Sequence, residues 1–398
     1  MSASSAWPDT TIGREFDVML GKMLDAERNR GDVKPFIGNR AVQWGRIDVS
    51  AVGSVPLTAN DQRRFRLRPG DLLVCEGGEV GRAAIWQGQL LECYYQKALH
   101  RLRSKSGYRP DVLLALLELW AGRGAFADFV TQTSIAHLPR ERFIAMPLPL
   151  IPREEQRAIA DALSDVSRMV AALERLVAKR EAIKQGLMQE LLTGRTRLPG
   201  FEEEWETTTL GEVARVKTGS RNNQDKSPLG KYPFFVRSPT VERIDSFAFD
   251  CEAILVPGEG NIGSIFHYVN GKFDVHQRVY KISHFDLSVH GRFVFHYLHQ
   301  FFGRHALANS VKATVDSLRL PTFTRFEMRI PGSVDEQRAI AQVLTDADDE
   351  LVALRARLEK AKAVKQGMMQ ELLTGRTRLP APKPAEATDA DDAEVQAA

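Results

Sequence analysis

The sequence predicts an α+β protein in which two mixed α/β modules are separated by two long helices that form an antiparallel coiled coil, giving a pseudo-twofold internal repeat. Three observations lead to this fold class. A 45-residue segment occurs twice in the 398-residue chain. Each copy carries apolar residues at the spacing of a helical seam. The residues before each copy contain short apolar runs that lead into glycine turns, which is typical of strands joined by hairpins.

The repeat is strongest between residues 155–199 and 336–380, which align without a gap and share 27 of 45 residues. Both copies open with EQRAIA and close with KQG(L/M)MQELLTGRTRLP. The duplication continues more faintly into the modules. There LLVCEGGEVGRAAI, from Leu72, resembles AILVPGEGNIGSIF, from Ala253, and the pairs Gln96–Lys97 and Gln277–Arg278 follow. Such similarity records a duplication, and the helical copies have diverged less than the modules.

The repeat divides the chain into five segments. We expect a first module over residues 1–152, a central helical spacer over 153–199, a second module over 200–331 and a C-terminal helix over 332–380. Residues 381–398 hold one lysine and five acidic residues and are rich in Ala, Pro and Asp, which predicts a disordered acidic tail.

The two spacers are predicted to be long amphipathic helices that pair with each other. In the first copy the seam residues are Ile159, Leu163, Val166, Val170, Leu173, Val177, Leu187 and Leu191, and in the second Ile340, Leu344, Ala347, Leu351, Leu354, Leu358, Met368 and Leu372. A helix of about 40 residues is roughly 60 Å long and would expose this stripe if it stood alone. Gly194 and Gly375 follow the last apolar residues and suit the left-handed position at a helix end. Two unrelated helices on separate cores are the alternative, which the lack of a second apolar face disfavours.

The modules are predicted to be mixed strands and helices. Leu72–Val74 and Ala253–Val256 suit short buried strands, and residues 111–120 and 293–302 suit amphipathic helices. Segments 34–48 and 231–245 combine aromatic, Asn, Arg and Gln residues and are interpreted as surface strands and loops.

Composition and charge narrow the function classes. Residues 1–152 carry a net charge of +4 and residues 207–331 carry +5, whereas segments 153–206 and 332–380 carry −2 and 0. This pattern suits two modules that face a polyanion. Three cysteines without CxxC spacing fit a reducing cytoplasm, and no apolar run reaches the length of a membrane helix.

The sequence predicts no catalytic residue and no metal ligand in this chain. The glycine loops at residues 77–81 and 258–263 are not the GxGxxG or GxxxxGK[ST] of nucleotide sites. The histidines do not form HExxH, and methyltransferase signatures of the NPPY type are absent from the sequence.

The order of module, EQRAIA…ELLTGRTRLP helix, module and repeated helix resembles the specificity subunit of type I restriction–modification systems. The resemblance covers nearly all of residues 7–380. It implies that each module is a target recognition domain for one half of an asymmetric bipartite site in double-stranded DNA. It also implies that the helices dock two copies of a modification (methyltransferase) subunit and that a restriction (motor-nuclease) subunit joins the complex. S-adenosylmethionine, ATP and Mg²⁺ are then expected on those partners, and no cofactor on this chain.

Base readout needs Arg for guanine, Asn or Gln for adenine and a carboxylate for cytosine, placed on exposed loops. The candidate DNA-binding residues in the first module are Asn39, Arg40, Gln43, Trp44, Glu76, Glu79, Gln96 and Lys97, and in the second Arg237, Ser238, Thr240, Glu259, Asn261, His276, Gln277 and Arg278. Alternatives stay open at this point. Trp44 also suits a core position, and the equivalent places of Gln96 and Gln277 also suit a phosphate contact or a shared strand.

Two other function classes stay open from the sequence: a nuclease or methyltransferase that acts alone, and a coiled-coil adaptor without a nucleic acid ligand. The missing motifs disfavour the first class and the basic modules disfavour the second. The target sequence, the gap between half-sites, the identity of the partner chains and the role of the acidic tail are not encoded in any recognisable pattern.

Overall fold

The computed structural model describes residues 6–25, 27, 29–131, 136–310 and 317–380. The predicted acidic tail, residues 381–398, lies outside the described residues. The chain forms two compact units. The first contains residues 1–172 and 358–398, and the second contains residues 173–357. The mixture of helices and sheets confirms the predicted α+β class.

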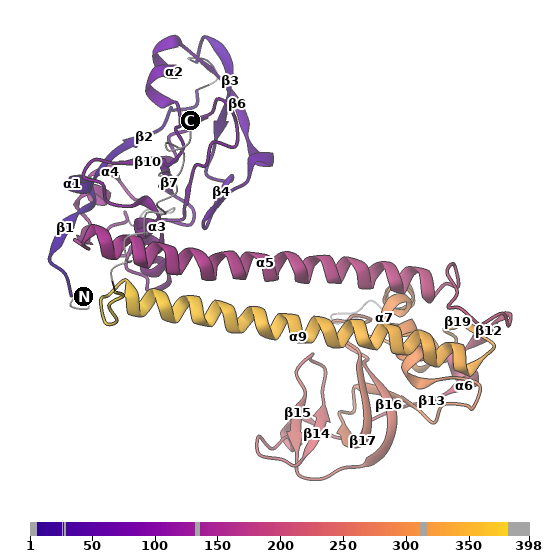
Figure 1. The fold of residues 1–398 in the computed structure, drawn as a ribbon. Coiled ribbons are helices and arrows are strands. Elements are labelled where there is room, and N and C mark those ends of the chain that lie inside the picture. The colour runs from indigo at the N-terminus through magenta and orange to yellow at the C-terminus, as the bar shows by residue number, and fades with distance from the viewer. Residues whose placement is uncertain (1–5, 26, 28, 132–135, 311–316, 381–398) are drawn as a thin grey trace, which may run out of the picture. The chain divides into compact units, whose positions relative to one another are not determined.

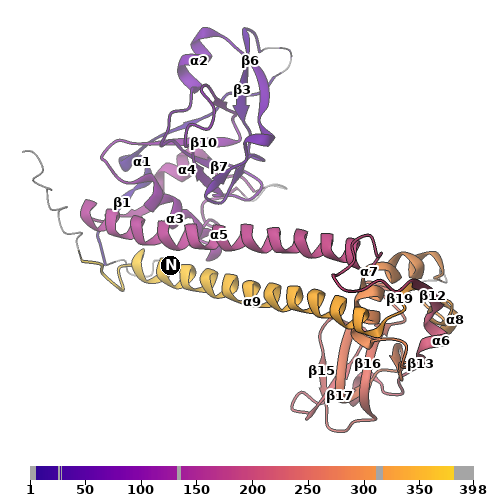
Figure 2. The same ribbon diagram turned by 45° about the vertical axis from the view of Figure 1, so that its right-hand side comes forward.

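The two long helices are α5, Arg153–Leu191, and α9, Val334–Leu372, and each contributes residues to both units. Within each unit their segments lie side by side and run in opposite directions (Figures 1 and 2). In the first unit, Ile159 and Leu163 share a core with Leu372. In the second, Leu191 shares a core with Ile340 and Leu344. Twelve of the sixteen predicted seam residues are buried, and the other four are half-buried: Val170, Leu187, Ala347 and Met368.

Basic residues that interrupt the predicted seam find carboxylates within their own unit. Arg180 Nε lies 3.0 Å from Glu350 Oε1, and Lys184 pairs with Asp348. In the first unit Lys365 Nζ lies 2.7 Å from Glu118 Oε1 on α3, Pro110–Gly122. Each carboxylate offsets the cost of placing a positive charge beside the apolar seam, so these basic residues do not interrupt the helices.

Each long helix ends at a glycine in the left-handed region, as predicted. Gly194 has a φ of 69° and Gly375 a φ of 73°. A Cβ on Gly194 would lie 3.1 Å from the Trp205 ring, and one on Gly375 would lie 3.1 Å from the Trp7 ring. The two tryptophans therefore close over equivalent helix ends, which explains why the glycines are repeated.

Among its described residues, the first module has four sheets, three further short α-helices and one 3-10 helix, η1 (Val49–Ala51). The elements are β1 (Asp9–Thr11), α1 (Ile12–Glu15), β2 (Phe16–Leu20), β3 (Asp32–Ile37), β4 (Val42–Gln43), β5 (Arg46–Ile47), β6 (Gly53–Leu57), α2 (Ala59–Phe65), β7 (Leu72–Cys75), β8 (Ala83–Ile85), β9 (Tyr94–Tyr95), β10 (Leu99–Ser104), α4 (Arg140–Ala145) and β11 (Pro147–Pro149). Strands β2-β10-β7-β8 form one sheet, β6-β3-β9 a second, and β1-β11 and β4-β5 are two-stranded. The apolar face of α3 packs on a core that also contains the first turns of α5.

The second module repeats this plan with one change. Its elements are β12 (Trp205–Thr209), α6 (Leu210–Val213), β13 (Arg215–Thr218), β14 (Tyr232–Phe235), β15 (Glu242–Ile244), β16 (Phe249–Pro257), β17 (His267–Val275), β18 (Val279–Ser283), α7 (Gly291–Ala308), α8 (Leu320–Thr324) and β19 (Glu327–Pro331). Here β17 is continuous and joins both groups of strands into one six-stranded sheet, β13-β18-β16-β17-β14-β15. In the first module the shorter β8 and β9 occupy the two halves of that path.

The predicted strands, hairpins and module helices are confirmed. Residues 72–74 and 253–256 fall inside β7 and β16, and residues 111–120 and 293–302 fall inside α3 and α7. Both glycine loops join antiparallel neighbours, since β7 pairs with β8 and β16 pairs with β17. A hairpin that presents a loop is therefore the correct interpretation of these glycines.

Candidate nucleic-acid interface

Three loops carry the candidate residues in each module, and backbone hydrogen bonds build them in the same way. The turn that follows the parallel strand is fixed by Gln96 N–H to Ile37 O at 3.1 Å, and by His276 N–H to Phe235 O at 2.9 Å. The same turn also binds the glycine loop, because the Glu76 N–H donates to Ala98 O at 2.9 Å. The equivalent bond, Gly258 N–H to Arg278 O, also measures 2.9 Å.

These bonds correct the equivalence between the modules that the sequence suggested. Gln96 corresponds to His276, because both make the same parallel bridge, to Lys22 and Arg221 respectively. Lys97 then corresponds to Gln277. The prediction that Gln96 and Gln277 occupy equivalent places is wrong by one residue, since the second module is two residues shorter between the glycine loop and this turn.

The two glycine loops share the same backbone conformation at two positions. Gly78 and Gly81 have φ values of 74° and 84°, and Gly260 and Gly263 have values of 85° and 68°. A left-handed backbone favours glycine, so both loops need glycine at the same two positions. Glu76 O and Gly258 O each accept a bond from a later strand-like segment, through Leu138 N–H at 2.7 Å and Leu318 N–H at 2.8 Å.

In the first module three of the candidate residues, Asn39, Trp44 and Glu79, meet in one cluster through Arg82. Trp44 Nε1 donates to Glu79 Oε1 at 2.6 Å, and Arg82 reaches the other oxygen of Glu79 at 3.2 Å. Arg82 also donates to Asn39 O at 2.9 Å. Trp44 is half-buried and packs against the core while its indole N–H reaches the surface, so both interpretations of this residue hold in part.

Glu76 is half-buried just before the glycine loop. Burial raises the pKa of its carboxyl, while the nearby His137 and Lys97 favour the charged form and oppose that rise. Gln43 Nε2 donates to Arg40 O at 2.9 Å, which holds the 40–43 turn. Arg40, Glu79 and Lys97 are exposed. The exposed candidates of this module therefore include both hydrogen-bond donors and acceptors.

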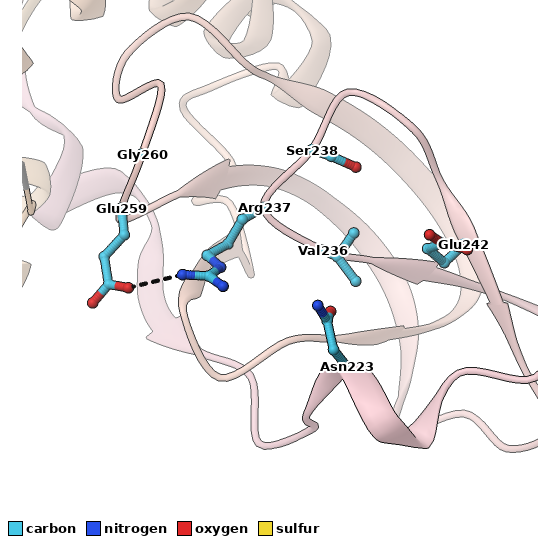
Figure 3. Close-up of a pocket in the computed structure, with 7 residues that line it drawn as sticks. All are labelled: Asn223, Val236, Arg237, Ser238, Glu242, Glu259 and Gly260. Carbon is cyan, nitrogen blue, oxygen red and sulfur yellow. Dashed lines mark hydrogen bonds and ion pairs between the residues drawn. The ribbon is translucent and has the colours of Figure 1, made fainter. Parts of the chain in front are cut away.

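In the second module, Glu259 lies between two arginines. Its Oε2 is 3.3 Å from Arg237 NH1 and its Oε1 is 3.1 Å from Arg278 NH1. Figure 3 shows Arg237 and Glu259 directed toward each other beside a hollow that Asn223, Val236, Ser238 and Glu242 also line. Ser238 Oγ donates to Thr240 O at 3.1 Å, which fixes the turn after Arg237.

His276 is the one candidate residue whose side chain is buried. It is 5% exposed, and its Nδ1 accepts the Arg278 backbone N–H at 3.0 Å. Burial lowers the pKa of its imidazole, and the positive charges of Arg237 and Arg278 lower it further. His276 therefore supports the loop from below, whereas the exposed Gln277 and Arg278 present their side chains.

Sequence reasoning missed several residues that the structure brings into these clusters. Arg82 bridges Asn39 and Glu79, and Asn222 Oδ1 accepts from Gln277 Nε2 at 2.5 Å. Asn223 and Glu242 line the hollow beside Arg237. Arg82 directly follows the glycine loop, a position that could have marked it. Asn261 and Thr240 lie on the same loops as the cluster residues.

The described residues contain no cluster of three or more His, Cys, Asp or Glu side chains that could hold a metal ion. No helix among them combines the length and apolarity that crossing a bilayer requires.

Comparisons with known proteins point in one direction. Residues 202–362 match the family model described as the type I restriction modification DNA specificity domain. The chain is 24% identical to a putative type I restriction enzyme MjaX specificity subunit from Methanocaldococcus jannaschii, over 89% of this chain and 90% of that protein. It is 30% identical to the type I restriction enzyme EcoDI specificity subunit from Escherichia coli, over 43% of this chain and 37% of that protein.

Solved structures share the fold. The S subunit of a type I restriction–modification system from M. genitalium matches with a TM-score of 0.68 at 15% identity, covering 94% of this chain and 97% of that one. A chain from a study of complex assembly and conformational transition of the type I R-M system matches with a TM-score of 0.54 at 17% identity, covering 93% of this chain and 98% of that one.

Proposed function

We propose that this chain, which is similar to specificity subunits of type I restriction enzymes, binds one half of an asymmetric, bipartite site in double-stranded DNA with each of its two modules. The loops 39–44, 76–82 and 96–98 would face the first half-site. The loops 237–242, 258–263 and 276–278 would face the second.

One observation carries this proposal: the two modules use the same loop scaffold to present different side chains. Where the first module has Glu79, the second has Asn261, and where the first has Lys97, the second has Gln277. Carboxylate, amide and ammonium groups prefer different base edges. A common scaffold with exchanged donors and acceptors is expected to read two different sequences.

Selection from a randomised DNA library tests the proposal. The co-expressed complex of this chain with its modification subunit should enrich sequences with two constant stretches separated by an unspecified gap. Binding that depends only on salt concentration, with no enriched sequence, would contradict it, because phosphate contacts alone give that behaviour.

We further propose that two copies of one modification subunit dock on α5 and α9, that a restriction subunit joins the assembly, and that this chain contributes no catalytic group. S-adenosylmethionine, ATP and Mg²⁺ would then bind to the partners. Methyl transfer by the purified chain alone, supplied with S-adenosylmethionine and Mg²⁺, would contradict the last point.

Support for docking at two places comes from repeated residues without a visible role in the chain. Gly186 and Gly367 lie inside α5 and α9 at equivalent positions, and a Cβ on either glycine would meet nothing within 4 Å. Glycine inside a helix costs about 0.5–1 kcal/mol relative to alanine. Ile183 and Val364, three residues earlier, are 40% and 45% exposed. A close-packed partner helix would explain both features.

The stoichiometry is the test of the two-copy arrangement. Light scattering of the co-expressed complex should give the mass of one specificity chain with two modification chains. A mass that corresponds to a single modification chain at saturation would contradict it.

A further inference from the structure

In the cluster of Arg237, Glu259 and Arg278, the two arginine side chains are more exposed than the carboxylate between them. The arginine side chains are 46% and 58% exposed, whereas the carboxylate between them is 23% exposed. Each oxygen of Glu259 is used by a different guanidinium (Figure 3 draws the Arg237 bond). The cluster carries a net charge of +1, so it favours a polyanion while its geometry is held by an acid.

All three residues stand on restrained backbone. Arg237 follows the buried Val236 at the end of β14, and Glu259 makes a bridge to Ser317. The Arg278 backbone N–H is fixed on the buried His276 ring at 3.0 Å. Burial and the charges of Arg237 and Arg278 lower the pKa of this imidazole against the opposing charge of Glu259, which favours the neutral ring whose Nδ1 accepts the bond. Side chains held in this way need little ordering on contact with a ligand.

A guanidinium has five N–H donors in a planar fork, so one bond to Glu259 leaves donors for a second acceptor. In the major groove, only guanine presents two acceptors, O6 and N7, on one base edge, and arginine is the side chain that matches them. We propose that Arg237 and Arg278 read guanine in the half-site bound by the second module, with Glu259 as a positioning residue that orients both forks. This inference rests on the proposed recognition of DNA and adds the base that is read.

The first module cannot build the same reader at the equivalent place. Its counterparts of Glu259 and Arg278 are Gly77 and Ala98, as the shared bridges and hydrogen bonds of the two loops show. Its carboxylate, Glu79, is held instead by Trp44 and Arg82. The guanine reader is therefore assigned to the second half-site alone, and the first half-site serves as an internal control.

The experiment uses the complex and its library-selected target. The half-site that stays constant when residues 1–150 are exchanged is that of the second module, and Arg237→Lys should relax the selection there, because lysine keeps the charge but lacks the fork. Each guanine of this half-site is then replaced in turn by 7-deazaguanine, which lacks the N7 acceptor. We expect at least one replacement to weaken binding by roughly 5- to 150-fold, the range that a bidentate pair contributes to base discrimination. The same replacement should have little further effect in Arg237→Ala or Arg278→Ala.

Glu259→Gln separates positioning from charge. Glutamine keeps the shape of the side chain but removes the negative charge that holds the two arginines. We expect the preference for guanine over adenine at the sensitive position to fall by about tenfold or more, while binding to unrelated DNA is kept or strengthened. The matched control is Arg329→Ala, an exposed arginine on β19 in a separate sheet, which should leave the preference unchanged.

Three outcomes would overturn the inference. A second half-site without guanine, or one that tolerates 7-deazaguanine at every position, would exclude this reader. If Glu259→Gln loses the preference for a cytosine instead, the carboxylate itself reads that base. If the variants weaken binding to all DNA sequences equally, the cluster contacts phosphate and not a base. A library that yields no enriched sequence would instead overturn the DNA-recognition proposal, and this inference with it.

Discussion

At the scale of single residues, the repeated EQR motif does the same work in each unit. Gln156 Oε1 accepts the Arg109 backbone N–H at 2.7 Å, and its Nε2 donates to Ile151 O at 2.8 Å. Gln337 accepts the N–H of His290 at 2.8 Å and donates to Pro331 O at 2.9 Å. Arg109 and His290 are the residues just before α3 and α7. One buried amide in each unit therefore ties the start of a long helix to the start of a module helix.

The neighbouring glutamates bind the repeated RTR motif. Arg197 donates two bonds to Glu336, at 2.6 and 2.7 Å, and Arg378 binds Glu155 in the same way. Repetition of these residues thus has an internal cause. Only repeated residues without such contacts, Gly186 and Gly367 among them, support docking of a partner.

A buried histidine of the first module predicts a dependence of stability on pH. His100 is fully buried, with Nε2 2.9 Å from Leu138 O, and burial lowers the pKa of its imidazole to about 4. The unfolded chain takes up a proton near pH 6.5 and the folded chain near pH 4, so stability falls as the pH drops through this window. The contribution of His100 is about 1.4 kcal/mol per pH unit.

We expect His100→Gln, which keeps a side-chain donor for Leu138 O, to flatten that decline. Chemical denaturation at pH 7, 6, 5 and 4 would measure it. His296, whose pKa burial also lowers to about 4, stays in the variant and leaves a residual slope. Parallel curves for the two proteins would show that His100 is not protonated on unfolding in this range.

At the scale of elements, the apolar seam of α5 and α9 was predictable from sequence, but the residues that are buried near the ends of these helices were not. Near the end of α5 the structure buries Met188 and Leu192, with Leu191, whereas the predicted Leu187 is half-buried. The last turns pack into the core of the module as well as against the other helix. A heptad pattern describes only contact with one neighbouring helix, so it fails where a third surface is added.

The equivalence of the modules shows a similar limit. The glycine loops could be matched by eye because their glycines are fixed by backbone conformation. The turn at 96–98 could not, because the first module divides the path of β17 into β8 and β9 with two extra residues before the turn. Matching Gln with Gln was chemically plausible, but hydrogen-bond register decides position and pairs Gln96 with His276.

The helix-interior glycines give a prediction in which stability and assembly change in opposite directions. Gly186→Ala and Gly367→Ala should each stabilise the chain by about 0.5–1 kcal/mol, because alanine is the better helix former and the space beside each glycine is open. Gly186→Leu should weaken binding of one modification subunit by filling the place where its backbone approaches. The double variant, Gly186→Leu with Gly367→Leu, should weaken binding of both modification subunits.

Ala178→Leu is the matched control, since Ala178 is an exposed position of α5 at which the two copies of the repeat differ. Binding of the modification subunit to this variant should be unchanged in calorimetric titration. Full assembly of Gly186→Leu and Gly367→Leu with two modification subunits would contradict docking at these glycines.

At the scale of the whole molecule, the duplication keeps the contacts of each module with its long helices and varies the loops. Trp7 and Trp205 cover equivalent helix ends, and Gln156 and Gln337 bind equivalent turns. By contrast, apart from the shared glycines, the equivalent pairs in the candidate loops differ in chemistry, as Glu79 and Asn261 or Lys97 and Gln277 do. A protein built in this way can change one recognition surface without changing the way that a module is attached.

This separation predicts the result of exchanging a module. Residues 1–150 would be replaced by the corresponding module of a relative that keeps a tryptophan at position 7 and a glutamate at position 118, because these side chains contact Gly375 and Lys365. The exchange carries both β1 and β11, whose pairing closes the module, and so leaves no strand without its partner. Selection with the hybrid complex should give a new first half-site and an unchanged second one, including the guanine assigned to Arg237 and Arg278. A change in both half-sites would mean that the loops of one module influence reading by the other, and that the two recognition surfaces are not independent.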